Sequence, residues 1–280
     1  MGLSRQKGPL YMVAASFCWS LGGLLIRFVP AEWGGMAING LRAAFAMLVF
    51  IIYQRGVKIE FTKGNLLAAF CLSATTTLFV FANLLTTAAA AILLQFTAPI
   101  FIILIHGIFY RQRPKASELI ASVVTILGML LFFMDQLDAG GTLGNILAIL
   151  SGLTFAGVMV CNKRPDTIPE QSLLLGFMVN AAIGLPFIFS NVTADAGGWT
   201  SVIVLGIIQI GLAYVFFSKG IKKTTALLAC LMTAVEPLLN PLWVGLVTGE
   251  VPGLFAILGG IIIIVTMLAY NIWLELGQKA

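Results

Sequence analysis

Long runs of hydrophobic residues, separated by short polar breaks, fill almost the whole chain. A helix rises about 1.5 Å per residue, so about 20 mostly apolar residues cross a hydrocarbon core about 30 Å thick. The pattern therefore predicts an all-α integral membrane protein with ten transmembrane helices. Their approximate ranges are 10–29, 35–53, 66–86, 90–110, 118–136, 143–162, 172–190, 200–218, 226–248 and 253–274.

Two of these spans have unusual boundaries. Only Thr86, Thr87 and a run of alanines separate the third and fourth spans, so we expect a tight turn there. The first span follows Arg5 and Lys7, as the apolar core of a signal peptide does. Because the span is long and has no convincing A-x-A cleavage site, we expect it to be the first membrane helix.

The composition agrees with a membrane protein and excludes several other classes. The chain is 60% hydrophobic and 10% charged, whereas soluble domains are roughly 45–50% apolar and about 25% charged. The net charge of +5 does not predict nucleic-acid binding, because the basic residues are scattered through short loops. Cys18, Cys71, Cys161 and Cys230 fall in different spans and form no metal-ligand pattern, so we expect no metal and no cofactor.

The placement of Lys and Arg predicts the orientation. If the N-terminus is cytoplasmic, the predicted outer loops contain neither residue, as the positive-inside rule requires. Only Arg27, at the outer end of the first span, and Arg42, inside the second, lie elsewhere. We therefore expect a multi-pass plasma-membrane protein with both termini in the cytoplasm. The basic residues on the cytoplasmic side are Arg5, Lys7, Arg55, Lys58, Lys63, Arg111, Arg113, Lys115, Lys163, Arg164, Lys219, Lys222, Lys223 and Lys279.

The chain also contains an internal repeat at an offset of 138 residues. Five spans in each half would make the second half, 138–280, enter the membrane in the opposite direction from the first, 1–137. The charges of the loops fit this inversion, because Pro114 lies among basic residues whereas its counterpart Pro252 has only Glu250 beside it. Inverted repeats are typical of secondary transporters. The offset pairs Phe17 with Phe155, Thr86-Thr87-Ala88 with Thr224-Thr225-Ala226, Pro99 with Pro237, and Pro114 with Pro252.

Several short motifs add a family resemblance that covers nearly the whole chain. They are Trp19, Arg42-Ala43-Ala44, Thr86-Thr87-Ala88-Ala89 leading to Pro99, and Glu236-Pro237 followed by Gly249-Glu250. With these motifs and five spans per half, the chain resembles the ten-helix drug/metabolite transporters of the EamA type. The family usually has an acidic residue where Gln112 stands, aligned with Glu250. The resemblance implies proton-linked or gradient-driven movement of amino acids, amines or similar metabolites.

Glu236 is the leading candidate for a functional residue. It lies near the middle of the ninth span, where an ionised acid costs about 2.5 kcal/mol or more. It should therefore face the bundle interior, with Thr233, Asn240 and Trp243 on the same face. There it would bind a cationic group or carry the coupling proton. The alternative is a structural ion pair, for which Arg42 is a candidate partner.

Prolines predict interruptions in both halves. Pro237 and Pro241 cannot donate hydrogen bonds to the carbonyls of Thr233 and Pro237, and Pro99 likewise frees the carbonyl of Gln95. Interrupted helices in corresponding positions point to the binding site of a repeat transporter. A plain packing kink is an equally good reading of these prolines.

Other polar and aromatic residues are weaker candidates for the cavity wall. Gln95 could orient a substrate, and His106 on the same face could relay a proton, although a lone histidine is more often a packing residue. Arg42 could bind a carboxylate or extend toward the interface, and Trp19 and Tyr214 could stack on a substrate or pack in the core. For the remaining polar residues, hydrogen bonds between helices are as good an explanation as a place in the cavity wall. These are Ser16, Ser20, Arg27, Asn83, Asn180 and Gln209.

These features favour a secondary transporter that moves a small polar metabolite, such as an amine or amino acid, by alternating access with a coupling proton. An enzyme would need a nucleophile with its base, a carboxylate pair or metal ligands, and none is apparent in the sequence. A channel would usually show a symmetric filter or rings of charged residues, and neither is apparent in the sequence. The remaining alternative is a membrane-embedded sensor or assembly protein with a transporter-like fold. The sequence leaves the substrate, the direction of transport and the oligomeric state open, a homodimer included.

Overall fold

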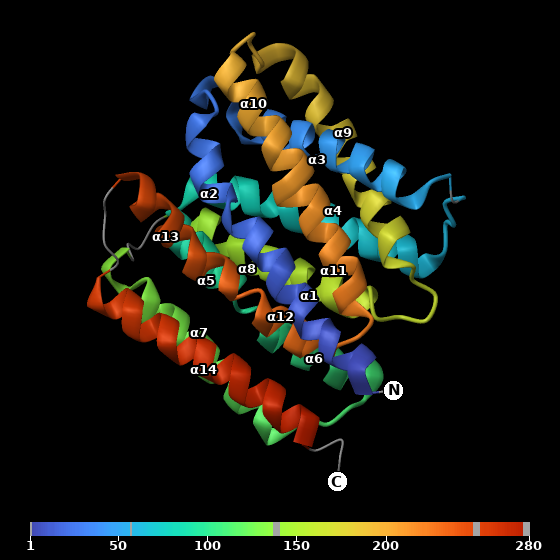
Figure 1. Ribbon diagram of the computed structural model, residues 1–280, viewed down its shortest axis with the longest axis vertical. Helices are drawn as coiled ribbons and strands as arrows, with labels where there is room; N and C mark the ends of the chain where they lie inside the picture. Colours follow the sequence, from blue (N-terminus) through green and yellow to red (C-terminus); the bar gives the residue numbers. More distant parts are fainter. Residues whose placement is uncertain (1, 57, 137–140, 249–252, 277–280) are drawn as a thin grey trace.

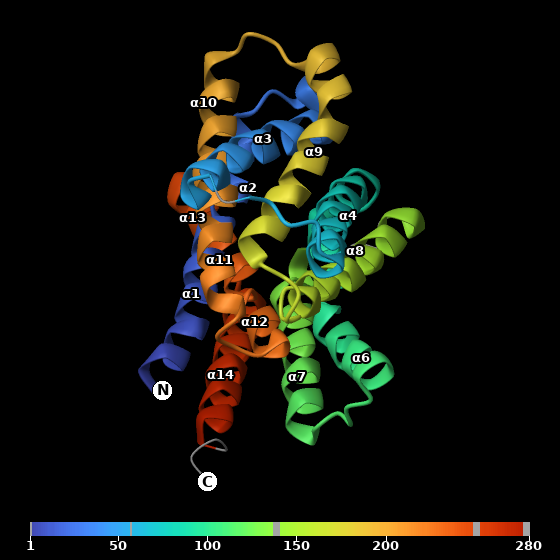
Figure 2. The same ribbon diagram turned by 90° about the vertical axis from the view of Figure 1, so that its right-hand side faces the viewer.

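The computed structural model describes residues 2–56, 58–136, 141–248 and 253–276, and all regular elements in these ranges are helical (Figure 1). The start of α1 and the end of α14 lie at the same end of the molecule (Figures 1 and 2). The elements are α1(Gly2–Ser20), α2(Gly22–Leu25), η1(Ile26–Phe28), η2(Ala31–Trp33), α3(Gly34–Gln54), α4(Lys63–Leu85), α5(Ala88–Gln95), α6(Ala98–Tyr110), α7(Ala116–Phe132), η3(Met134–Gln136), α8(Thr142–Cys161), α9(Pro169–Asn191), α10(Ala196–Val204), η4(Leu205–Leu212), α11(Ala213–Ile221), α12(Ala226–Met232), α13(Val235–Thr248) and α14(Leu254–Leu276).

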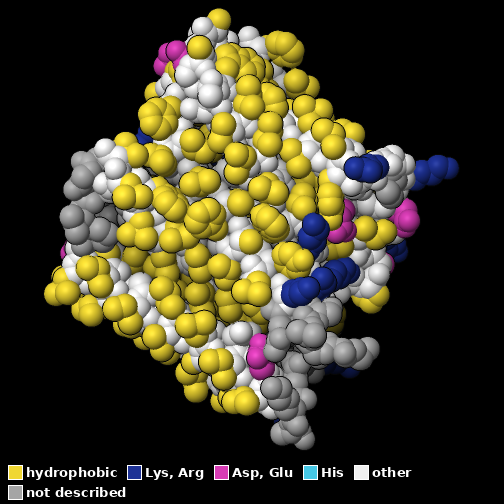
Figure 3. Space-filling view, in the orientation of Figure 1, with side chains coloured by type: hydrophobic (Ala, Val, Ile, Leu, Met, Phe, Trp, Pro, Cys, Tyr) yellow, Lys and Arg dark blue, Asp and Glu magenta, His cyan; other side chains and the backbone are white. Residues whose placement is uncertain are grey.

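The helical segments are long and apolar enough for a membrane protein. Within the described ranges, eight of them meet the length and hydropathy needed to cross a bilayer. Two shorter apolar segments, Ala116–Phe132 and Ala226–Leu239, lie at the fifth and ninth predicted spans. The turn between α4 and α5 contains only Thr86 and Thr87, so the tight turn expected there is confirmed. Figure 3 shows a broad hydrophobic face, with most of the visible Lys and Arg side chains along one edge.

Two of the predicted spans are interrupted at corresponding places. The fourth consists of α5 and α6, separated by residues 96–97, and the ninth consists of α12 and α13, separated by residues 233–234. In both cases the break comes shortly before a proline, Pro99 or Pro237. A threonine caps each segment, because Thr87 Oγ1 accepts a hydrogen bond from Ala90 N at 3.2 Å and Thr225 Oγ1 accepts one from Leu228 N at 3.1 Å.

The packing pairs join the two halves of the chain. α3 packs against α9, α4 against α8, α7 against α14, and α1 against α11. Figure 1 shows α7 and α14 side by side along one edge, and Figure 2 shows α3, α9 and α10 at the opposite end of the long axis. Glycines allow the helices to approach closely at these crossings. A Cβ on Gly40 of α3 would lie only 2.6 Å from the Cα of Gly184 on α9.

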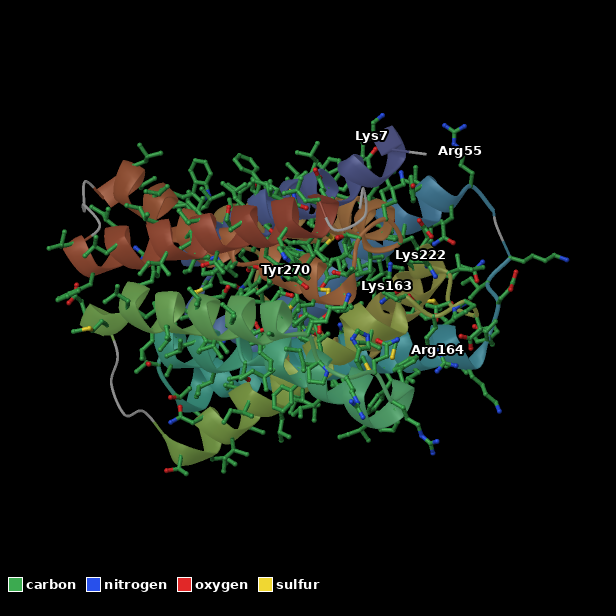
Figure 4. The ribbon with its side chains drawn as sticks, turned by 90° about the horizontal axis from the view of Figure 1, so that it is seen from below. Lys7, Arg55, Lys163, Arg164, Lys222 and Tyr270 are labelled. Atoms are coloured by element: carbon green, nitrogen blue, oxygen red, sulfur yellow. The ribbon has the colours of Figure 1, made fainter. Side chains whose placement is uncertain are left out.

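The basic loops lie together at one end of the bundle, where Lys7, Arg55, Lys163, Arg164 and Lys222 are labelled in Figure 4. These residues come from the start of α1 and from the α3–α4, α8–α9 and α11–α12 connections. We call this the basic end of the molecule.

Hydrogen bonds connect two of the loops at the basic end. Asn65 Nδ2 donates to Gln171 Oε1 at 3.1 Å, and Asn65 Oδ1 accepts from Ile168 N at 2.8 Å. Asp166 accepts from Gly64 N at 3.0 Å and forms an ion pair with Arg164 at 2.9 Å. The Arg164 guanidinium lowers the pKa of the Asp166 carboxyl below its ordinary value. The α3–α4 and α8–α9 connections are therefore fixed to each other.

Candidate functional site

A cavity of about 780 Å³ lies inside the bundle, between helices of both halves. The first half contributes residues of α1, α2, η1, α3, α4, α5, α7 and η3, and the second contributes residues of α8, η4, α11, α13 and α14. The volume suits a small metabolite. The charged residues that line this cavity are Arg27, Arg42, Asp135 and Glu236, and polar side chains beside them include Asn39, Gln95, Gln209, Tyr214 and Thr233.

The cavity extends toward the end of the bundle opposite the basic end. Arg27, Asn83 and Asp135, which line it there, lie at or near the ends of η1, α4 and η3 that are remote from the basic loops. We call this group the mouth. No described Lys or Arg of the basic end lines the cavity.

Aromatic side chains separate the cavity from the basic end. The rings of Trp19 and Tyr214 pack edge to face with centroids 5.0 Å apart, and the ring of Phe217 lies 5.6 Å from that of Tyr214. Phe177 and Phe50 continue this cluster, with centroid distances of 5.4 Å from Tyr214 to Phe177 and 5.4 Å from Phe177 to Phe50. We call these five residues the aromatic floor. Phe50, Phe177 and Phe217 are fully buried and do not line the cavity, so the cavity ends at Trp19 and Tyr214 on that side.

Arg42 and Glu236 face the same cavity from opposite halves of the chain. Arg42 lies in α3, and its Nε atom is buried without a hydrogen-bond partner. Glu236 lies in the first turn of α13, where the helix N-terminus favours a negative charge. The two side chains are close enough for their charges to interact, but they form no ion pair within 4.0 Å. Among the described residues, the single ion pair is that of Arg164 and Asp166.

Gln95 lies at the end of α5, where the first of the two interrupted spans breaks. Its Nε2 donates to Ser151 Oγ on α8 at 2.7 Å, and Ser151 Oγ donates to the carbonyl of Thr75 at 3.1 Å. These bonds hold the Gln95 amide against the cavity wall. At the matching break before α13, the Ser16 hydroxyl lies 3.2 Å from the carbonyl of Met232 and 2.9 Å from the carbonyl of Met12 in its own helix, so the two carbonyls share one donor. A side chain from a neighbouring helix thus reaches the interrupted backbone, as expected inside a membrane.

The structure does not bring every candidate to the cavity. His106 does not line it and packs instead against Tyr110, with ring centroids 5.6 Å apart. Pro99 is buried outside the cavity wall, whereas Pro237 is part of it. The side chains of Asn240 and Pro241 lie outside the described part of the structure. Within the described ranges, no group of three or more His, Cys, Asp or Glu residues is placed to hold a metal ion.

Comparison with known sequences identifies the family. A sequence model of the EamA-like transporter family matches residues 6–134 and again residues 142–272. The chain belongs to the EamA-like transporter family. Together with the apolar helices, this membership makes it a multi-pass membrane protein and a transporter rather than an enzyme.

Relatives of this EamA-like transporter are themselves named as transporters. The transporter YwfM of Bacillus subtilis is 27% identical over 252 residues, which are 83% of this chain and 84% of that protein. The pseudopaline exporter CntI of Pseudomonas aeruginosa is 22% identical over 279 residues, 95% of this chain and 96% of that protein. A crystal structure with 17% sequence identity superposes with a TM-score of 0.80 over 98% of this chain and 99% of its own, which shows a shared fold.

The geometry of this EamA-like transporter adds residues to those singled out from its sequence. Asp135 lines the mouth. In the sequence it lies at the end of a predicted span, where nothing distinguishes it from a charged loop residue. Thr75 and Thr76 also line the cavity, and no sequence signal distinguishes them from the other threonines of α4. Chemically, the site offers guanidinium and carboxyl groups, amides and aromatic rings, which together can bind and orient a small polar solute.

Proposed function

We propose that this protein is a secondary transporter for small zwitterions or amines of the amino-acid type. The observation that carries the proposal is that Arg42 and Glu236 line one cavity without forming an ion pair. A carboxylate bound to Arg42 and an ammonium group bound to Glu236 would give both side chains a charged partner. A solute that carries both groups matches the site best.

The proposed mechanism is alternating access between two inverted halves of five spans each. Three observations support it. The interruptions at residues 96–97 and 233–234 are separated by about the same offset as the sequence repeat. The family model matches each half separately. The contact of α1 with α11 has its counterpart, at the same offset, in the contact of α8 with α4. Halves related in this way can rock about a central site.

The orientation of the cavity fits one state of that cycle. The positive-inside rule puts the basic end, with both termini, in the cytoplasm of a cell whose plasma membrane the protein crosses. The mouth then opens to the outside, and the aromatic floor closes the path to the cytoplasm. Rocking of the halves would open the floor and close the mouth.

Glu236 is the proposed coupling residue. A carboxyl group inside the membrane is more easily accommodated when it is protonated or paired. Proton binding at Glu236 would release a bound ammonium group, and proton loss would favour its binding. Transport would therefore depend on pH, because substrate and proton compete for the same carboxylate.

Flux measurements in liposomes test the proposal. The purified protein should transport at least one member of a panel of L-amino acids and polyamines, at a rate that changes with a pH gradient. Glu236→Gln should weaken binding of the ammonium group by about tenfold or more, through loss of a charged contact, and remove the pH dependence. Glu32→Gln is the matched control, because Glu32 is an exposed acid outside the cavity.

Two results would contradict the proposal. Normal pH-dependent flux by Glu236→Gln would exclude Glu236 as the coupling residue. Tight binding of a panel compound without flux by the wild-type protein would instead favour the sensor or assembly function.

A further inference from the structure

The eighth predicted span differs from its counterpart in the first half. Between α10 and α11, residues Leu205–Leu212 form the π-helix η4. The residues 138 positions earlier, 67–74, lie in the regular helix α4. A π-helix is rare and often lies at a functional site, because its i→i+5 hydrogen bonds widen the turn. η4 packs against α1 and α3 beside the cavity, so it alters the cavity wall in one half only.

The wide turns of η4 put two polar side chains on the same wall. Residues five apart lie about 140° apart around the axis of a regular α-helix, but one above the other in a π turn. The N–H of Ala213 donates to the carbonyl of Ile208, five residues earlier. Gln209 and Tyr214 have the same spacing, and both line the cavity.

Gln209 has an unused hydrogen-bond acceptor at this wall. The residue is only 5% exposed, and its Nε2 donates to the carbonyl of Trp19 on α1 at 3.2 Å. A carbonyl can only accept, so this contact fixes the NH₂ group toward α1 and leaves Oε1 on the other side of the amide. Oε1 is buried without a hydrogen-bond partner. A buried acceptor without a partner costs free energy, which a bound donor would recover.

We propose that Gln209 Oε1 accepts a hydrogen bond from an ammonium N–H of the transported solute, and so makes the cavity select primary ammonium groups over N-trimethylated ones. The inference rests on the proposed function, in which Arg42 binds the carboxylate and Glu236 attracts the positive charge. It adds a residue that distinguishes an ammonium nitrogen that carries hydrogen atoms from one that is fully methylated.

Charge alone would not give this selectivity. The charge of Glu236 attracts a primary and a quaternary ammonium group alike, whereas hydrogen bonds to the Glu236 carboxylate and to Gln209 Oε1 both require an N–H. Removal of Gln209 Oε1 leaves the Glu236 acceptor in place and so isolates the second hydrogen bond. The aromatic rings of Trp19 and Tyr214 would act in the opposite direction, because aromatic side chains bind quaternary ammonium groups well. The change in the relative affinity for the two kinds of ammonium between the wild type and Gln209→Leu therefore measures the contribution of Gln209.

The test uses matched pairs of probes on the purified full-length protein. Binding of glycine, L-alanine, L-leucine and L-phenylalanine, each with its N,N,N-trimethyl analogue, is measured for the wild type and Gln209→Leu. The wild type should prefer the primary forms. Gln209→Leu should weaken binding of the primary forms by about ten- to a hundredfold and that of the trimethyl forms by less than about twofold. Gln209→Glu should retain the preference, because a carboxyl group keeps an acceptor oxygen there.

The ratio of the two affinities separates the outcomes. A wild type without preference, or with a preference for the trimethyl forms, would overturn the inference. Equal weakening of both forms by Gln209→Leu would also overturn it, because that result indicates only a lost contact with Trp19; in both cases the proposed transport function would stand. If no probe binds the wild type, the proposed substrate class is wrong and the inference fails with it. Should Gln209→Leu not fold, Gln209→Asn, which withdraws the amide oxygen by one methylene, replaces it with the same criteria.

Discussion

At the residue scale, the cost of burying polar groups in a membrane identifies much of the cavity wall. Glu236, Arg42 and Gln95 are intramembrane polar residues that must face the protein interior, and all three line the cavity. The same argument does not place His106, which is half-buried outside the cavity and contacts Tyr110 of its own helix α6. The lack of an ion pair between Arg42 and Glu236 depends on how α3 and α13 pack, which helical periodicity does not encode.

The Asp166 carboxylate at the basic end gives a prediction for stability. Its pKa is lowered by the hydrogen-bonded Arg164, so the carboxylate stabilises the fold at neutral pH. This contribution is fully present above the unfolded pKa, about 4, and is lost as the pH falls through the lower folded value. Asp166→Asn should lower the thermal midpoint at pH 7 by on the order of 2 °C, and the deficit should shrink toward pH 3. Differential scanning fluorimetry measures both, with Glu60→Gln, an exposed acid of the neighbouring α3–α4 connection, as the control. A deficit independent of pH would contradict the assignment.

At the element scale, the hydrophobic runs predict where helices lie but not their internal geometry. The boundary at Thr86 and Thr87 is visible in the sequence because polar residues interrupt an apolar run. The interruption before α13 comes at residues 233–234, ahead of Pro237, because a proline removes hydrogen bonds to the preceding turn. The π-helix η4 leaves no such sign, since its sequence is as apolar as that of a regular membrane helix.

The crossing of α3 and α9 gives a prediction for packing. Gly40→Ala would put a Cβ 2.6 Å from the Gly184 Cα, a backbone atom that cannot move independently. We expect the two helices to separate and the protein to lose about 1–3 kcal/mol of stability. Gly107→Ala is the matched control, because a Cβ there would lie 3.8 Å from its nearest neighbour, the Gln112 carbonyl. Thermal midpoints in detergent compare the two, and a Gly40→Ala variant as stable as Gly107→Ala would show that the crossing tolerates a side chain.

At the scale of the whole molecule, the pairing of the halves follows from neither hydropathy nor composition. The offset of 138 residues predicts that the halves resemble each other, but it does not say which helices meet. The contacts of α3 with α9 and of α7 with α14 each join counterparts from the two halves. The cavity therefore lies between the halves, which is the location that alternating access requires.

Accessibility of single cysteines tests this arrangement in cells. Asn83 lines the mouth and Lys58 is exposed in a loop of the basic end, so the two positions should lie on opposite sides of the membrane. With the native cysteines Cys18, Cys71, Cys161 and Cys230 replaced, Asn83→Cys should react with a membrane-impermeant thiol reagent in intact cells. Lys58→Cys should react only after permeabilisation. A transported solute that drives the halves toward the inward-open state should slow the labelling of Asn83→Cys several-fold while leaving Lys58→Cys unchanged. Labelling of Lys58→Cys in intact cells would show that the orientation is opposite to the proposed one. If no transported solute alters the labelling of Asn83→Cys, that result would contradict rocking of the halves about this cavity.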